Sequence, residues 1–155
     1  SSVSREAEIL NTLQRNLPNV LGVHVPIITA GGLMAIVAMR KTAEGQARQA
    51  ILAALGTEFY CKCVVVVDDD VDIFNLSDVM WAVITRTRAD RDFVFIPGAM
   101  GAILDPTSDP EDHTLTKLGV DATKPSGRDF AERLTIANDQ QDRVRGMMER
   151  AGFKI

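Results

Sequence analysis

The fold is decided by residues 61–87, CKCVVVVDDDVDIFNLSDVMWAVITRT. The apolar run over 61–67, in which Lys62 is the one polar residue, predicts a strand buried on both faces, which is typical of strands covered by helices. This strand ends on four carboxylates: Asp68, Asp69, Asp70 and Asp72. A helix is expected to begin near Ser77, with Asn75 or Ser77 as its cap, and to run through Thr87.

The residues before this stretch predict a helix and a pair of strands. Residues 4–16 repeat apolar side chains at helical spacing, so we expect a helix there. The β-branched, alternating run over 20–28 and the apolar run over 33–41 predict strands. The turn at Gly31-Gly32 favours an antiparallel pair. Thr42 is the expected cap of a second helix.

After the central stretch, the sequence predicts two more strands and a final helix. Residues 92–96, DFVFI, predict a strand closed by Pro97-Gly98, and residues 98–116 a long connection. A short strand is expected over 117–123. Residues 138–151 carry an apolar stripe with helical spacing, so we expect a C-terminal helix there.

Together these elements predict an α/β fold. Strands and helices alternate from 34 to 96, which favours parallel neighbours joined by right-handed crossovers. We expect a mostly parallel sheet of about five strands with flanking helices, plus a C-terminal helix. Residues 1–155 are then a single domain, with an N-terminal helix over 1–17, an α/β core over 18–125 and a helical tail over 126–155.

The composition excludes several classes of protein. The chain has 155 residues, of which 46% are hydrophobic and 25% are charged, as in ordinary globular domains. Its net charge of −4 argues against binding nucleic acid through phosphate contacts. No apolar run reaches the roughly 18 residues of a membrane span. The beginning, SSVSREAE, carries neither Met nor a signal-type apolar core, so we expect a processed or excised piece.

The two cysteines and two histidines predict no reactive centre. Cys61 and Cys63 lie too close along a strand for an unstrained disulfide, so we interpret them as core residues in a reducing cytoplasm. His24 falls within an apolar strand, where a core or interface position is more typical than a catalytic one. His113 lies in an acidic loop without a nearby nucleophile. No glycine-rich phosphate motif is present, and we assign no catalytic, cofactor-binding or metal-binding residue.

The acidic cluster supports two interpretations. Carboxylates at the carboxyl end of a parallel strand can hold Mg²⁺, and VVVVDDD with a later Lys124-Pro125 resembles a phosphate-accepting receiver domain. Asp68 and Lys124 are, however, too close in sequence for the strands that a receiver places between them. The structural interpretation, which we favour, has these acids capping turns and a helix and pairing with Arg86 or Arg88.

A longer segment, residues 62–93, resembles the C-terminal domain of UbiD-type decarboxylases, the 3-polyprenyl-4-hydroxybenzoate decarboxylase family. The residues that match the family pattern are Val67, Asp68, Asp70, Asp72, Asp78, Val79, Trp81, Ala82 and Arg86. The run from Leu118 to Thr123, with Asp121 and Thr123, resembles the closing Gly-x-Asp-Ala-Thr motif of the family. Upstream, EGQARQAI at 44–51 resembles a helix start of the family, so the likeness covers about residues 19–125.

This resemblance implies part of an enzyme. Such enzymes add or remove CO₂ on aromatic or α,β-unsaturated acids, as in ubiquinone biosynthesis, with prenylated FMN, a divalent metal (Mn or Mg) and K⁺. The flavin-binding domain precedes the matched region, so the implied partners are that domain and further copies in a homo-oligomer. The chain alone is then expected to bind no cofactor and to be inactive.

Within the family, this domain contributes to subunit interfaces and closes the substrate cleft. The resemblance therefore makes Phe93, Phe95 and Pro97 candidates for the apolar wall and rim of the cleft; the alternative is that both phenylalanines are core residues. The helix over 138–151 is a candidate subunit contact. A different class of function, a stand-alone assembly or ligand-binding module, would be favoured if the native gene product lacked a flavin-binding region.

Overall fold

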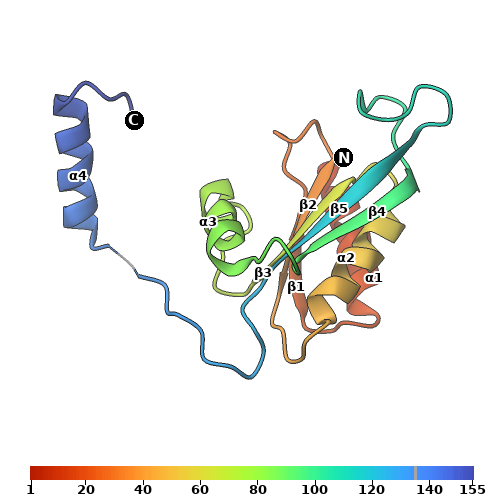
Figure 1. The fold of residues 1–155 in the computed structure, drawn as a ribbon, viewed down its shortest axis with the longest axis horizontal. Helices are drawn as coiled ribbons and strands as arrows, with labels where there is room; N and C mark the ends of the chain where they lie inside the picture. Colours follow the sequence, from red (N-terminus) through yellow and green to blue (C-terminus); the bar gives the residue numbers. More distant parts are fainter. Residues whose placement is uncertain (135) are drawn as a thin grey trace.

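A computed structural model describes residues 1–134 and 136–155. Over these residues the chain forms four helices and five strands (Figure 1). In chain order they are α1 (Ser2–Gln14), β1 (Val20–His24), β2 (Met34–Met39), α2 (Gln46–Thr57), β3 (Cys63–Asp68), α3 (Leu76–Arg86), β4 (Phe93–Met100), β5 (Thr114–Ala122) and α4 (Asn138–Arg150). The α/β class and the C-terminal helix are confirmed.

The five strands form one mixed sheet in the order β1-β2-β3-β5-β4. The central pairs β2–β3 and β3–β5 are parallel, whereas the edge strands β1 and β4 are antiparallel to their neighbours. The antiparallel pairing of β1 with β2 and the parallel neighbours around α2 were predicted correctly. The expectation of a parallel crossover through α3 was wrong, because β5 inserts between β3 and β4.

Helices cover the two faces of the sheet unequally. Helices α1 and α2 pack on one face, where Ile9, Leu13, Ala50 and Ile51 meet alternate residues of β2 and β3. On the other face, Val79 and Ala82 of α3 pack over the strand residues that point to that side of the sheet, such as Val65, Val67 and Val120. Both faces of β3 are therefore buried, as its continuous valine run predicted.

Several boundaries differ from the sequence prediction: β1 ends at His24 and not at 28, and β5 begins at Thr114 and not at 117. Helix α2 begins after Gly45, whose φ of 90° places it in the left-handed region, and not at Thr42. The Thr42 amide instead donates to Oε1 of Gln46. Strand β4 continues through Pro97 with a shift in register between Ile96 and Ala99. An edge strand tolerates Pro because one row of its backbone groups has no partner strand.

The C-terminal segment extends away from the sheet. Between β5 and α4, the residues that the structure describes form neither helix nor strand. In Figure 1, α4 lies apart from the other elements, and it has no buried residue. Among the described residues, no helix combines the length and apolar character needed to cross a lipid bilayer.

Candidate functional site

The carboxyl ends of β3 and β5 hold a buried ion network centred on Arg86. The last turn of α3 places this guanidinium beside the acids that follow β3, and its side chain is only 2% exposed. Nη1 lies 2.8 Å from Oδ2 of Asp68, and the two terminal nitrogens bind the two oxygens of Asp70 at 2.8 and 2.7 Å. The backbone N–H of Lys124 donates to Asp68 at 2.8 Å, which ties the end of β5 into the network.

The two acids differ in their environment. Hydrogen bonding to Arg86 lowers the pKa of Asp70 below its ordinary value. Burial raises the pKa of Asp68, against the opposing effects of the Lys124 amide and Arg86. Two carboxylates face the Arg86 guanidinium, and the Lys124 ammonium lies 4.0 Å from Asp70, so two cations stand against the two acids. Among the described residues, Arg86 Nε has no hydrogen-bond partner. The evident role of the network is to join α3, β3 and the chain after β5.

A second layer of polar contacts organises the start of α3. The side chain of Asn75 caps the helix by accepting from the amides of Ser77 and Asp78, so the predicted Asn75 cap is confirmed. Asp72 accepts from the amide of Phe74, and Asp78 accepts from the amide of Asp72.

Trp81 joins this layer to the tail of the chain. Asp78 also binds Arg133, and this contact lowers the pKa of the carboxyl group. The Arg133 guanidinium lies 4.0 Å from the centre of the Trp81 ring, and that of Arg86 lies 4.9 Å from it. Such cation–π contacts stabilise by about 0.5–1 kcal/mol at exposed sites.

Asp121 and Thr123 form a turn at the end of β5. The Asp121 carboxylate accepts hydrogen bonds from the backbone N–H of Thr123 at 3.0 Å and from its hydroxyl at 2.5 Å. Over the described residues, no group of three or more His, Cys, Asp or Glu side chains is arranged to hold a metal ion. Asp68 and Asp70 are bound to Arg86, so a divalent cation does not fit between them.

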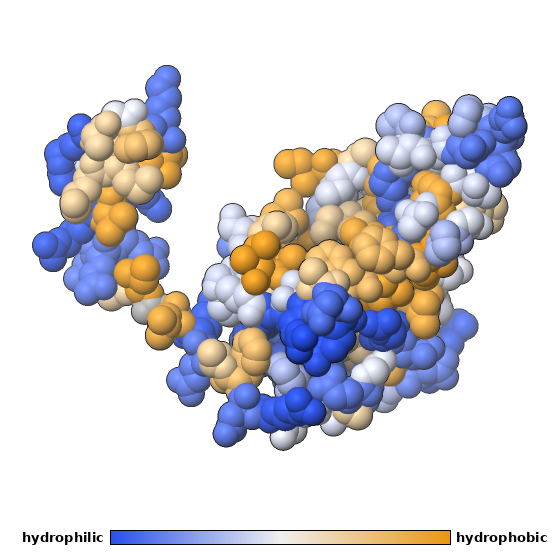
Figure 2. All heavy atoms as spheres, viewed as in Figure 1, coloured by the Kyte–Doolittle hydropathy of each residue, from blue (hydrophilic) through white to orange (hydrophobic). Residues whose placement is uncertain are grey.

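The second part of the candidate site is an uncovered strip of the sheet on the α3 side. The strand register places four apolar side chains in one row across the sheet: Met34, Cys63, Leu118 and Phe95. All four are half-buried or exposed, and Phe95 is 66% exposed. We call this set the Phe95 row. Figure 2 shows apolar surface over β4 and on the neighbouring α3.

The predicted cleft residues occupy different positions relative to this row. Phe93 lies one row further along, opposite Val120, and packs into the core beneath α3. Val94 and Ile96 pack on the opposite face, as the alternation predicted. Pro97 is exposed at the register shift of β4. The structure therefore separates Phe93, a core contact, from Phe95 and Pro97, which are accessible.

Sequence reasoning missed Met34, Cys63 and Leu118 as members of a shared surface. Each lies in an apolar strand and looks like core when taken alone. Only the pairing of β2, β3, β5 and β4 brings the three residues into line with Phe95. The row is apolar, so it fits an aromatic ring or a hydrocarbon group and offers no ligand to a metal or to a flavin phosphate.

Residues 1–122 match a family model described as the 3-octaprenyl-4-hydroxybenzoate carboxy-lyase C-terminal domain. Among curated relatives, the anhydromevalonate phosphate decarboxylase of Methanocaldococcus jannaschii is 41% identical over 137 residues, which cover 85% of this chain and 32% of that protein. The gallate decarboxylase of Lactiplantibacillus plantarum is 37% identical over 115 residues, which cover 72% and 24% respectively. The chain thus spans about a third, or less, of the length of these relatives.

Solved structures give the same picture. A UbiD-class enzyme from Pelotomaculum thermopropionicum in complex with FMN superposes with a TM-score of 0.82 at 37% identity, over 90% of this chain and 32% of that chain. The 3,4-dihydroxybenzoic acid decarboxylase of Klebsiella pneumoniae, in its apo form, superposes with a TM-score of 0.77 at 29% identity, over 92% and 32%. An evolved dimeric form of the Pelotomaculum enzyme was solved with prFMN.

Proposed function

The chain belongs to the 3-octaprenyl-4-hydroxybenzoate carboxy-lyase C-terminal domain family, and we propose that it closes the substrate cleft of a decarboxylase and contributes to its subunit contacts. The proposed substrates are aromatic or α,β-unsaturated carboxylic acids. Gallate, phenolic acid and anhydromevalonate phosphate decarboxylases among the relatives support this class. The reverse reaction, carboxylation, uses the same groups.

The Phe95 row carries this proposal. It lies at the margin of the core that α3 covers: Phe95 is exposed, and Met34, Cys63 and Leu118 are half-buried. Contiguous exposed apolar surface of this kind marks a contact with another domain or a ligand. When the row lies over a bound acid, it removes water from around the reacting carboxylate and contacts the apolar body of the substrate.

The chemistry itself is proposed to come from the rest of the enzyme. Prenylated FMN, with a divalent metal and K⁺, supplies the bond-breaking chemistry when it is bound to the flavin-binding domain of the same protein. In this chain, the Arg86 network holds α3 against β3 and β5 and so fixes the position of the helix relative to the Phe95 row. These residues position the wall and do not touch the reacting atoms.

Subunit contacts are proposed for α4. This helix exposes Val144, Met147 and Met148 on one side and has no buried residue within the chain. An amphipathic helix without a partner exposes apolar area that another subunit can cover. Removal of residues 138–155 from the full-length enzyme is expected to lower the oligomer mass measured by light scattering. An unchanged mass would contradict the role of α4 in assembly.

The cleft role is tested by Phe95→Ala in the full-length enzyme. We expect kcat/KM for the native acid to fall roughly tenfold, about 1.4 kcal/mol of transition-state stabilisation, because one wall of the cleft loses its ring. The matched control is Phe74→Ala, which removes an exposed ring outside the row. Unfolding in urea should be nearly unchanged in both variants. Unchanged kinetics in Phe95→Ala, or a loss explained by unfolding, would contradict the proposal.

A further inference from the structure

A second buried cation, Lys117, belongs neither to the Arg86 network nor to the Phe95 row. The residue is 4% exposed, and its ammonium donates one hydrogen bond, to the backbone carbonyl oxygen of Phe59 at 3.0 Å. An ammonium carries three N–H donors, and no carboxylate of the described residues lies within 4 Å of it. Burial lowers the pKa of Lys117, although Cys61 and Glu58 act in the opposite direction. The charge is therefore poorly compensated within this chain.

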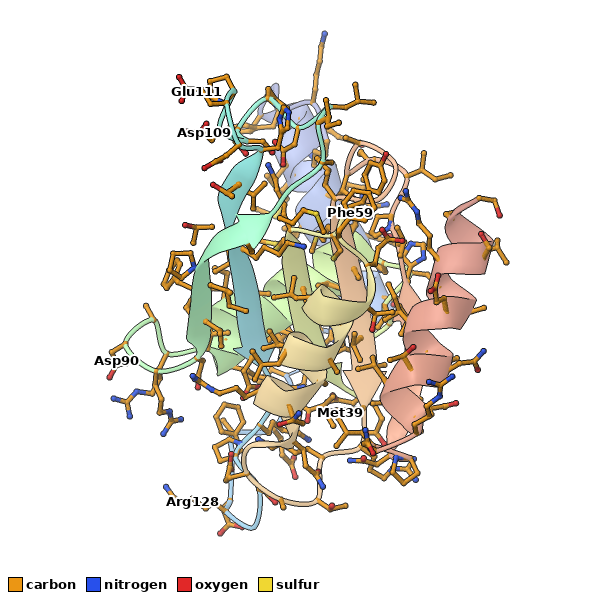
Figure 3. All side chains as sticks on the ribbon, turned by 90° about the vertical axis from the view of Figure 1, so that its right-hand side faces the viewer. Met39, Phe59, Asp90, Asp109, Glu111 and Arg128 are labelled. Atoms are coloured by element: carbon orange, nitrogen blue, oxygen red, sulfur yellow. The ribbon has the colours of Figure 1, made fainter. Side chains whose placement is uncertain are left out.

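Lys117 forms one wall of an otherwise apolar pocket of about 280 Å³. The other lining residues come from the end of α2, the following turn and the edge strand β4: Leu52, Leu55, Gly56, Phe59, Ile96, Ala99 and Met100. Phe59 and Met100 are exposed, so the pocket opens to solvent. Figure 3 places Phe59 at the opposite end of the sheet from Met39 and Arg128. We call this cavity the Lys117 pocket.

The Lys117 pocket lies on the other face of the sheet from the Phe95 row. Lys117 and Leu118 are consecutive residues of β5, so their side chains point to opposite faces. Leu118 belongs to the row on the α3 side, whereas the pocket is bounded by α2. A ligand in the Lys117 pocket is thus separated from the proposed cleft by the thickness of the sheet.

We propose that the Lys117 pocket binds a small carboxylic acid with an apolar body, the carboxylate facing the Lys117 ammonium and the body lying among Phe59, Ile96 and Met100. A buried cation with unused donors is destabilising until an anion pairs with it. A single charge in apolar walls matches a monocarboxylate, because a phosphate dianion would keep one charge without a counterion. The inference does not depend on the proposed decarboxylase function, and its test needs no turnover.

The experiment titrates the 155-residue chain with benzoate and, as a neutral probe of similar shape, with benzyl alcohol. Binding is followed by amide chemical shifts and by calorimetry. We expect saturable benzoate binding, with shifts concentrated in residues 55–59, 96–100 and 117, and at least tenfold weaker binding of benzyl alcohol. Equal affinity for the two probes, no saturation, or shifts confined to the Phe95 row would overturn the proposal.

Variants separate the pocket from general surface charge. Lys117→Met is expected to weaken benzoate at least tenfold while binding of benzyl alcohol is retained. The matched control Lys154→Met removes an exposed lysine near the C-terminus and should leave both affinities unchanged. Should Lys117→Met fail to fold, Met100→Asp at the exposed rim adds a negative charge to the pocket wall and is expected to weaken benzoate more than benzyl alcohol. Benzoate affinity that survives either change, or falls equally in the control, would contradict the site.

Discussion

Arg86 and Lys117 are equally buried cations, yet the chain treats them differently. Arg86 binds two carboxylates at the carboxyl ends of β3 and β5, whereas Lys117 has one carbonyl oxygen as its partner. Arg86 approaches the sheet from α3 on one face, whereas Lys117 belongs to β5 and its side chain lines a pocket on the other face. The difference shows that burial alone does not define a structural ion: the fold gives Arg86 two carboxylate partners, whereas it gives Lys117 only a carbonyl oxygen.

The largest effect is expected from Arg86→Met. Removing the guanidinium leaves Asp68 buried without a counterion, which should lower the free energy of unfolding by about 3–5 kcal/mol. Urea unfolding followed by circular dichroism measures this loss. The matched control is Arg88→Gln, because Arg88 pairs with Asp90 at the surface and the change should be within about 1 kcal/mol. Similar small losses in both variants would mean that the Arg86 network is not structural.

A smaller change, of opposite sign, is expected from Lys117→Met. Replacing the ammonium by an apolar side chain of similar length removes a desolvated charge, so we expect the free energy of unfolding to stay the same or rise by about 1 kcal/mol at neutral pH. The same urea experiment measures it, in the absence of any carboxylic acid. A loss comparable to that of Arg86→Met would show that the bond to Phe59 is essential, and the contrast between the two cations would fail.

The smallest expected effect is the pH dependence of the free energy of unfolding that arises from Lys117. Its folded pKa is lowered from 10.5, so between the folded value and 10.5 the unfolded state holds more protons than the folded state. The stability of the wild type relative to Lys117→Met should therefore rise as pH increases through that window. Burial raises the pKa of Cys61 to about 12 from 9.0, which lowers stability above pH 9 in both proteins. Because Lys117 itself lowers the pKa of Cys61, this contribution differs between the two proteins, and the Lys117 effect is measured below pH 9. A difference independent of pH would contradict the poorly compensated charge.

The local sequence pattern predicted the helices and strands well, but it did not predict which strands are neighbours throughout the sheet. The valine run of β3, the Asn75 cap and the helical stripes of α1 and α3 are local signals, and each element formed where it was expected. The position of β4 was not available from such signals. Residues 101–113 turn the chain back from β4 so that β5 pairs with it in antiparallel. The first residues of β5 were predicted to belong to the long connection over 98–116.

The same limit applies to the candidate sites. Asp68 and Arg86 could be paired from sequence because a strand end and the following helix place them close together. Lys117 could not be identified, because a lysine in an alternating strand is ordinarily exposed. Its burial depends on Phe59 and Met100, which come from two other parts of the chain. Likewise, Cys63 and Phe95 share a surface only after the strand order is known.

The register shift at Pro97 has a consequence for the free edge of the sheet. An uninterrupted edge strand as apolar as β4 would invite another copy to add its own strand and grow into an aggregate. Proline supplies no N–H, and the register shift between Ile96 and Ala99 interrupts the strand at its middle. A strand from another copy could therefore pair only with two short stretches that differ in register. The chain can thus leave the aromatic ring of Phe95 exposed on the face of β4 while the edge of the same strand disfavours pairing with another copy.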